Sequence, residues 1–509
     1  MITAAIFTDK QEFLGYNKWM QKTISKTDFV RYLECPRYGW LYKNRPDLLD
    51  KTQSRIAKQG GQVEELAHGL FPKGIEVPWK NAFEETMKLL KNGTPVIYQA
   101  TLKTDKYLAR ADILVKDKDG KGWHLYEVKS STQVKPEHIP DICFQTNLFE
   151  ECGMKLYSIN IIHINNKYVF DEKKGLEIKK FLIIENLTEK IRENQREFAD
   201  LMTEAHTVLT SPDEPHPKIL AKSFNYDPGP LLNEYYWKGI PDYSIYNIGR
   251  IYEKELAKLT EEGIIAIRDI PEGFFKNERK NLQVEITKTE KPFIDRTKIA
   301  ETMSTLEYPL YFLDYETVNP AVPLFDGTRP YQMICFQYSL HVQRTPKSKL
   351  EHYEFLHTEK DNPVPHLLKQ LQSESGNKGT VFVWNQGFEK VRNNEMGKEY
   401  PEYRDFLEAL NARVYDLMKI VSQGMYEDFR FKGSASIKKV LPVLVPELSY
   451  ENLDIGQGGE AMDAWYEIMG HQTVETKKER AETIKSMLEY CKQDTLAMVK
   501  ILEFLKNLH

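Results

Sequence analysis

The chain has 509 residues, too many for one hydrophobic core at about 150 residues per domain. With 41% hydrophobic and 28% charged residues, it has a globular composition, which excludes collagen-like, disordered and disulfide-stapled classes. The net charge is −5, from 70 basic and 75 acidic residues. Total charge therefore gives no reason to expect a nucleic-acid partner.

The start of the chain and its cysteines predict a cytoplasmic protein. Asp9 and Lys10 occur before the apolar segment of a secretory signal can form. No apolar stretch approaches the roughly 18 residues of a membrane-spanning helix, so we expect no membrane association. The 5 cysteines are scattered without a CxxC pair, which is typical of a reducing compartment.

Residues 1–58 concentrate positive charge. They hold 11 basic and 6 acidic residues, a net charge of +5 that leaves −10 for the remainder. Cations beside aromatic faces suit single-stranded nucleic acid. The alternative is that the aromatic side chains form the core of a helical start. They are Phe29, Tyr32, Tyr38, Trp40 and Tyr42.

The hydrophobic pattern predicts a multidomain α/β protein with two α/β domains and a helical connector. Residues 256–274 in the connector have a helix–Gly-turn–helix pattern, which presents backbone N–H groups to a phosphate or serves only as a spacer. The predicted strands are 95–102, 106–115, 122–131 and 155–164, with helices at 138–153 and 187–209. The predicted domains are 1–209, 210–306 (the connector) and 307–509.

Asp119-Gly120 lies between two predicted strands and indicates a type I′ hairpin turn. With these two residues as the loop, Asp112 lies opposite Glu127, and Glu127 shares a face with Lys129. Facing carboxylates inside a fold need a cation between them, and Mg²⁺ or Mn²⁺ prefers oxygen ligands. Lys129 would orient water and offset charge on a phosphate. The alternative is a solvated Glu–Lys strand on the surface.

A second acidic set lies towards the C-terminus. Asp314 and Glu316 share one face of the apolar segment YPLYFLDYET, where carboxylates are costly unless they are used. The segment VFVWNQGFEK has the pattern of a strand that leads into a turn and a helix, and Glu389 lies in its helical part. Tyr490 and Asp494 are i, i+4 neighbours on an amphipathic helix. The alternative is a solvated acidic rim.

The first set resembles the PD-(D/E)XK nucleases and, among them, the RecB-type and CRISPR-associated exonucleases. The resemblance rests on Asp112 followed by Glu127-x-Lys129, and on Gln145 followed by Phe149, which is similar to a Gln-x-x-x-Tyr motif. It implies a restriction-endonuclease-like fold. It also implies that Asp112 and Glu127 bind metal and that Lys129 and Gln145 are catalytic.

The segment around Cys35-Pro36 resembles the N-terminal helix of these nucleases. Counting from Gly60, Glu64 occupies the place of a metal-binding His in many relatives. Such relatives often hold a four-iron cluster on one N-terminal and three downstream cysteines. No cysteine lies between Cys152 and Cys335, so we expect no iron–sulfur cluster.

Residues 308–509 resemble the DEDDy exonucleases of the RNase H-like fold. The resemblance implies that four carboxylates bind two divalent ions and that Tyr490 helps to place the attacking water. Glu389 stands where the family usually has Asp, and Asp416 is the alternative acid or a structural residue. The motifs are Asp314-x-Glu316, Asn385-x-x-Phe388-Glu389 and Tyr490-x-x-x-Asp494.

Nearly the whole chain resembles an uncharacterised bacterial family that joins these two nuclease types. We therefore expect a metal-dependent nuclease with two active centres, acting on DNA in preference to RNA, in repair or defence. Protein partners in such a complex are compatible with this expectation. One alternative is that only one centre is active and the other is a nucleic-acid clamp. Another is a non-catalytic nucleic-acid-binding assembly protein.

Overall fold

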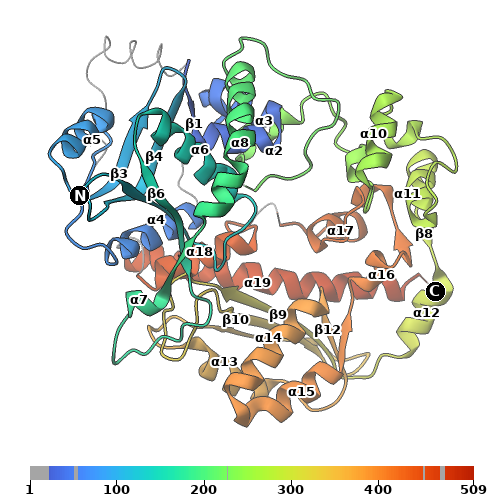
Figure 1. Ribbon diagram of the computed structural model, residues 1–509. Helices are drawn as coiled ribbons and strands as arrows, with labels where there is room; N and C mark the ends of the chain where they lie inside the picture. The colour runs from blue at the N-terminus through green and yellow to red at the C-terminus, as the bar shows by residue number, and fades with distance from the viewer. Residues whose placement is uncertain (1–21, 51–54, 226, 451–452, 471–475, 509) are drawn as a thin grey trace. The chain divides into compact units, whose positions relative to one another are not determined.

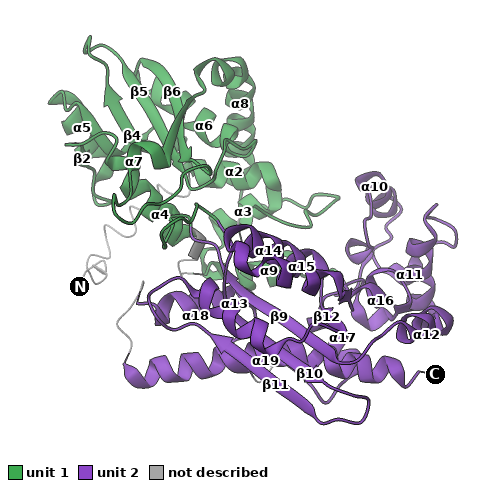
Figure 2. Ribbon diagram, turned by 90° about the horizontal axis from the view of Figure 1, so that it is seen from below, with its two compact units in different colours: residues 1–240, 321–331 green, residues 241–320, 332–509 purple. Residues whose placement is uncertain are grey.

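The computed structural model describes residues 22–50, 55–225, 227–450, 453–470 and 476–508 (Figure 1). The chain forms two compact units (Figure 2). Unit 1 comprises residues 1–240 and 321–331, and unit 2 comprises residues 241–320 and 332–509. Both are α/β, as the sequence predicts. The expected connector is not a separate body, because residues 210–240 belong to unit 1 and residues 241–306 to unit 2.

The sheet of unit 1 has seven strands in the order β2-β3-β4-β5-β6-β7, with β1 paired to β4. Strands β3, β4 and β5 are antiparallel, and β6 runs parallel to β5 after a helical crossover. Four of these strands match predicted ones. The strands are β1 (Ile24–Ser25), β2 (Ile75–Glu76), β3 (Val96–Lys103), β4 (Tyr107–Lys116), β5 (Trp123–Lys129), β6 (Leu156–Ile164) and β7 (Leu182–Asn186).

Helices of unit 1 surround this sheet. Helix α2 begins with a capping box, in which the Ser25 Oγ accepts from the Asp28 N–H and the Asp28 carboxylate accepts from the Ser25 N–H. The helices are α2 (Lys26–Glu34), α3 (Pro36–Asn44), η1 (Pro46–Leu48), α4 (Arg55–His68), α5 (Ala82–Lys91), α6 (His138–Glu151), α7 (Ile178–Phe181), α8 (Thr188–Leu209) and α9 (Pro230–Tyr236).

The aromatic side chains near the start of the chain belong to the core of unit 1. Phe29, Tyr32, Tyr38 and Trp40 are buried on α2 and α3. Tyr42 is half-buried, with the Arg31 guanidinium 3.7 Å from its ring centroid. The core alternative is therefore correct for these residues. Residues 1–21 and 51–54 of the basic stretch lie outside the described residues.

The predicted register of the hairpin β4–β5 is confirmed. Ile113 lies opposite Tyr126, and Leu114 lies opposite Leu125. This register directs Asp112 towards Glu127, and the Val128 N–H donates to the Asp112 Oδ2 at 2.7 Å. The surface-strand alternative is wrong for Glu127, which is 2% exposed.

The predicted turn type is wrong. The Asp117 N–H donates to the Gly122 carbonyl at 2.8 Å, so the loop has four residues, not two. Of the two residues predicted for the turn, Gly120 has a positive φ (72°) and Asp119 does not. The side chains of Asp117 and Asp119 accept N–H groups two residues further on, which stabilises the longer loop. Both loops are centred on the same point, so the register is unchanged.

Unit 2 contains a five-stranded sheet in the order β11-β10-β9-β12-β13 and a two-stranded sheet of β8 and β14. Strands β9, β10 and β11 are antiparallel, whereas β12 runs parallel to both β9 and β13. The strands are β8 (Phe293–Ile294), β9 (Leu310–Val318), β10 (Ile334–Gln343), β11 (Leu350–Leu356), β12 (Thr380–Val383), β13 (Val414–Asp416) and β14 (Tyr426–Glu427).

The long helix α19 lies against the larger sheet of unit 2 (Figure 1). The Gln337 side chain donates to the Met487 carbonyl at 2.9 Å, and the hydroxyls of Ser339 and Thr495 are 2.7 Å apart. Both contacts tie α19 to β10. The longer helices of unit 2 are α10 (Glu253–Glu261), α11 (Glu278–Thr289), α12 (Arg296–Ser304), α13 (Pro363–Glu374), α14 (Gln386–Glu399), α15 (Arg404–Ala412), α17 (Ile437–Leu444), α18 (Gly458–Ile468) and α19 (Lys477–Lys506).

Short helical turns complete unit 2: η2 (Ile245–Asn247), η3 (Ile267–Asp269), η4 (Pro401–Tyr403), α16 (Lys419–Ser422) and η5 (Phe429–Phe431). The helix–Gly-turn–helix predicted for 256–274 is wrong in its second half. Residues after Gly263 form only the three-residue η3, and α11 begins at Glu278. Among the described residues, we find no helix that combines the length and apolarity needed to cross a membrane.

Candidate active sites

The first predicted set converges in unit 1. Glu127 on β5 accepts from the Lys129 ammonium at 2.8 Å through its Oε1, and from the Gln145 amide at 2.7 Å through its Oε2. The other amide atom of Gln145, Oε1, is buried without a hydrogen-bond partner in the described structure. Three predicted residues therefore meet in one buried polar cluster.

Two further members of this cluster were not predicted. Lys26, at the start of α2, donates to the Glu127 Oε1 at 2.7 Å. Asp141 on α6 accepts from Lys129 and, at 3.3 Å, from Gln145. We call the six residues the lysine–carboxylate cluster: Lys26, Asp112, Glu127, Lys129, Asp141 and Gln145.

Glu64, on α4, lies beside this cluster. Its Oε1 accepts from the Gln99 amide, which in turn accepts from the Arg110 guanidinium. Gln99 has a left-handed backbone (φ 57°) in the middle of β3. Burial raises the pKa of Glu64, and the charge of Glu127 raises it further. The metal-binding role that the resemblance implies for Glu64 stays a prediction.

Charges in the lysine–carboxylate cluster are compensated by its two lysines. Burial alone would lower the pKa of Lys129, but Asp141 and Glu127 raise it well above its usual range. Burial alone would raise the pKa of Asp141, but Lys129 and Lys26 lower it. Asp112 differs, because burial and the charge of Glu127 raise its pKa well above the usual value.

The second predicted set converges in unit 2. Asp314 and Glu316 project from the central strand β9, and the register pairs Asp314 with Ser339 on β10. Glu389 lies on the first turn of α14, and Asp494 lies on α19 where that helix crosses the sheet. Asp314 is half-buried, and the other three side chains are buried. We call these four residues the acid cluster.

Two hydroxyl groups surround Asp494. The Tyr450 hydroxyl donates to the Asp494 Oδ1 at 2.5 Å. Tyr490, one turn before Asp494 on α19, accepts from the Lys438 ammonium at 3.3 Å. The sequence predicted Tyr490 but neither Tyr450 nor Lys438, both of which come from the segment between the strands and α19.

Asp416 has a structural role. Its Oδ1 accepts from the backbone N–H of Asn385 at 3.0 Å and of Met418 at 3.1 Å, so it fixes the starts of two helical segments. Asn385 itself has a left-handed backbone (φ 86°). Glu389, by contrast, has a buried Oε2 without a hydrogen-bond partner among the described residues. The unpartnered oxygen marks Glu389 as the better candidate ligand.

Burial and mutual repulsion disfavour the charged forms in the acid cluster. Burial, Asp494 and Glu316 raise the pKa of Asp314 well above its usual range. Burial and Asp494 raise the pKa of Glu316 to about 8, and burial raises that of Glu389 to about 8. Burial also raises the pKa of Asp494 to about 6, although hydrogen bonding to Tyr450 lowers it.

The acid cluster has the chemistry of a cation site. In the described parts of the chain, none of its four carboxylates forms a salt bridge with lysine, arginine or histidine. Ligand atoms of Asp314, Glu316 and Cys491 lie within 4.8 Å of one another. Burial and Asp314 raise the pKa of the Cys491 thiol, which favours its protonated form, so the carboxylate oxygens are the groups of this site suited to a hard cation.

These pKa values predict how stability depends on pH in EDTA. Between pH 4.5 and about 8, Glu316 and Glu389 hold more protons in the folded than in the unfolded protein. Linkage then requires the free energy of unfolding to fall as pH rises through this window. We expect the melting temperature in EDTA to fall by several degrees from pH 5 to pH 8.5.

Mn²⁺ should remove most of this fall, because bound cations keep the carboxylates ionised without repulsion. The matched control is a protein with both Glu316→Gln and Glu389→Gln, which should show a flatter profile in EDTA. A wild-type profile in EDTA identical to that of this double variant would contradict the prediction.

Comparisons with known proteins give no function. Residues 311–436 match a family described as a domain of unknown function (DUF2779), a segment that contains Asp314, Glu316 and Glu389 but ends before Asp494. An uncharacterised protein of Mycoplasma genitalium is 24% identical over 245 residues, which is 44% of this chain and 36% of that protein. A homologue in Mycoplasma pneumoniae is 29% identical over 223 residues, 40% of this chain and 32% of that protein. The chain spans about a third of the length of these curated relatives. No solved structure matches the chain.

Proposed function

We propose that unit 2 is a metal-dependent nuclease that hydrolyses phosphodiester bonds at the 3′ ends of nucleic acid, with DNA favoured over RNA. The observation that carries the proposal is the acid cluster, in which four carboxylates converge without a salt bridge in the described chain. An uncompensated buried carboxylate is costly, so a cation that binds there gains the energy of relieving the repulsion. The resemblance of this set to the DEDDy exonucleases adds the class of substrate.

The acid cluster would hold Mg²⁺ or Mn²⁺, and bound ions would supply an activated water and stabilise the leaving oxygen. Around them, this chain's own residues have separate tasks. The Tyr450 hydroxyl holds Asp494 through a hydrogen bond of 2.5 Å. Lys438 donates to Tyr490, which orients the phenol that would place the attacking water.

The lysine–carboxylate cluster supports a second centre of the PD-(D/E)XK type in unit 1. Asp112 and Glu64 have raised pKa values and would hold a divalent ion together with Glu127. Lys129 and Gln145 would position water and phosphate. A specific observation favours the alternative of a single active centre in unit 2. In unit 1 the ammonium groups of Lys26 and Lys129 already compensate Glu127.

The test is degradation of end-labelled single- and double-stranded DNA and RNA with Mn²⁺ or Mg²⁺, with EDTA as the negative control. We expect Asp314→Ala to abolish release of 3′ nucleotides. If both centres act, Glu127→Ala removes a separate part of the activity; if unit 2 acts alone, it removes none. Activity that survives both substitutions would contradict the proposal. Binding that persists in EDTA without any turnover would favour a non-catalytic assembly protein.

A further inference from the structure

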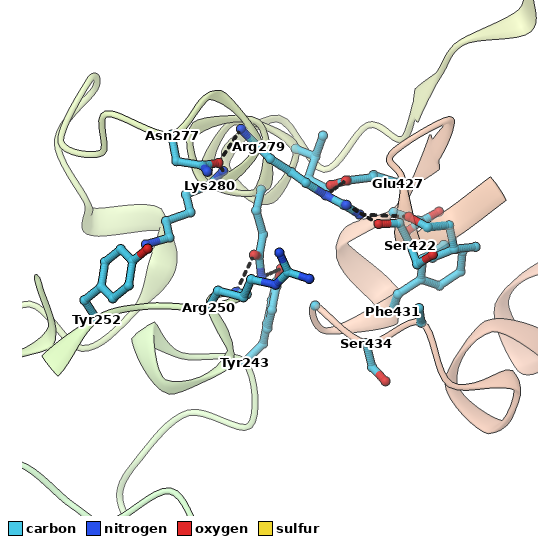
Figure 3. A pocket seen from close by; sticks show the side chains of 17 residues that line it. Tyr243, Arg250, Tyr252, Asn277, Arg279, Lys280, Ser422, Glu427, Phe431 and Ser434 are labelled. Carbon is cyan, nitrogen blue, oxygen red and sulfur yellow. Dashed lines mark hydrogen bonds and ion pairs between the residues drawn. The ribbon is translucent and has the colours of Figure 1, made fainter. Parts of the chain in front are cut away.

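Unit 2 contains a cavity of about 380 Å³ that the acid cluster does not explain (Figure 3). Its walls come from the loop before α10, from the first turns of α11 and from residues 421–435. The aromatic side chains of Tyr243, Tyr252 and Phe431 contribute to these walls. The volume lies in the usual range of ligand pockets, and aromatic walls are typical of such pockets.

Both carboxylates that line the cavity are already paired. Glu427 accepts from the Arg279 Nε at 2.8 Å, and Arg279 crosses the cavity to reach it (Figure 3). Asp428 accepts from the Arg430 guanidinium at 2.6 Å. These acids therefore carry no uncompensated negative charge that would repel an anion.

The lysine and arginine side chains that line the cavity differ in whether an acidic group already pairs with them. Lys280 is buried and donates to Glu255 at 2.6 Å, with its ammonium 4.4 Å from the Tyr252 ring centroid. Arg250 is exposed and has no hydrogen bond or ion pair in the described structure. Arg250 also has a left-handed backbone (φ 53°), which is uncommon for a residue with a side chain. The uncompensated positive charge of the cavity is therefore that of Arg250.

The wall that carries Arg250 is fixed to α11. The Gln283 amide donates to the Tyr243 hydroxyl at 2.9 Å and to the Asn247 carbonyl at 3.0 Å, and it accepts from the Gly249 N–H at 3.1 Å. All three contacts precede Arg250 closely in the chain. The cavity is thus held open by buried polar contacts on this side.

The opposite wall of the cavity, which contains Gly433 and Ala435, is continuous in the chain with Lys438 beside the acid cluster. Gly433 has a left-handed backbone (φ 73°), and a Cβ there would lie 2.3 Å from the Asn247 carbonyl, so a side chain cannot fit. The Ala435 carbonyl accepts from the Trp384 indole at 3.0 Å. Three residues later, Lys438 donates to Tyr490 beside Asp494. One short segment therefore joins the cavity to the candidate catalytic residues.

We propose that this cavity binds a nucleotide, with its phosphate at Arg250 and its base against the aromatic walls. The proposal deepens the proposed function of unit 2 and rests on it for the class of substrate. The nucleotide is either a unit of the substrate strand upstream of the 3′ end or a free mononucleotide. Both share a phosphate for the guanidinium and a base that stacks on aromatic rings.

The experiment measures binding of a fluorescent oligodeoxythymidylate of 12 nucleotides to the full chain, in a buffer that contains Ca²⁺, at several salt concentrations. We expect Arg250→Gly to weaken binding roughly tenfold and to reduce the salt slope by about 0.7, the loss of one phosphate contact on a single strand. Glycine tolerates the left-handed backbone, so this variant should fold. Arg250→Lys should restore the salt slope. The matched control is Arg268→Ala, which removes an exposed cation of unit 2 outside the cavity.

A second arm titrates the same proteins with deoxyadenosine monophosphate. Binding that depends on Arg250 identifies a mononucleotide site; dependence with the oligonucleotide alone identifies a strand site. Equal affinities and salt slopes for wild type and Arg250→Gly in both arms would overturn the inference. Hydrolysis is measured separately on wild type. If binding depends on Arg250 but no hydrolysis is found, the inference stands and the proposed function is overturned. If hydrolysis is found but binding does not depend on Arg250, the proposed function stands and the inference is overturned.

Discussion

Asp314→Asn is expected to lower metal-dependent hydrolysis by at least about 10²-fold, the cost of losing one group that stabilises charge in a transition state. The same substitution should raise the melting temperature in EDTA. It removes a carboxyl group whose charged form is disfavoured first by burial and then by repulsion from Asp494, Glu316 and Glu389, and both causes raise its pKa. Opposite effects on activity and stability are the signature of a functional carboxylate.

The control for this prediction is Asp416→Ala in the same unit. Asp416 accepts two backbone N–H groups, so its loss leaves those donors without their partner and should lower the melting temperature in EDTA. Thermal melts with and without Mn²⁺, and release of labelled nucleotides, measure both effects. Equal activity of Asp314→Asn and wild type, or a lower melting temperature of Asp314→Asn in EDTA, would contradict the assignment of Asp314 as a ligand.

Local spacing was enough to predict which acids face one another. Asp314 and Glu316 are two residues apart on one strand and therefore share a face. Tyr490 and Asp494 are one turn apart on one helix, so backbone periodicity brings each pair together. The hairpin register was equally predictable, because a loop centred between Asp119 and Gly120 determines every pair on β4 and β5. The turn type was not, since it depends on which side chains bond the loop backbone.

Long-range partners were outside the reach of the sequence. Lys26 and Glu127 are 101 residues apart, and only the fold brings the start of α2 to β5. Tyr450 is 44 residues from Asp494 and lies in a loop without a motif. Asp141 could have been found, because it lies four residues before Gln145 on the same face of α6. The inclusion of residues 321–331 in unit 1 also had no signal in composition or periodicity.

The two clusters differ in how the charge of their buried carboxylates is compensated. In unit 2 the carboxylates form no salt bridge in the described chain, and burial and mutual repulsion raise their pKa values although Lys438 lowers those of Glu316 and Asp494, so a bound cation would supply the missing counter-charge. In unit 1 the fold supplies the counter-charge itself, through Lys26 and Lys129. Lys129 therefore has a structural role in addition to the catalytic role that the resemblance implies. Measuring the stability of unit 1 in Lys129 variants tests the structural role separately from hydrolysis.

Lys129→Met is expected to destabilise unit 1 by about 3–5 kcal/mol, the usual cost of removing one partner from a buried ion pair. The methionine would remove one of the two salt bridges of the buried Glu127, leaving the 2.7 Å contact with Lys26, and would leave Asp141 without its closest cation. Glu127→Gln in the same protein should recover part of the loss, because the ammonium of Lys26 then has only one carboxylate, that of Asp141, to compensate. Hydrogen exchange of the β5 and α6 amides measures the effect within unit 1.

Lys88→Met is the matched control in unit 1. Lys88 is exposed and lies 3.4 Å from Glu85, so its loss should cost less than about 1 kcal/mol. Similar exchange rates in Lys88→Met and Lys129→Met would contradict the structural role of Lys129. Recovery of β5 protection in Lys129→Met with Glu127→Gln would show that the lysine compensates the buried carboxylate. Loss of the hydrolysis assigned to unit 1 in Lys129→Met alone, at a temperature where β5 stays protected, would show that the lysine also serves the reaction.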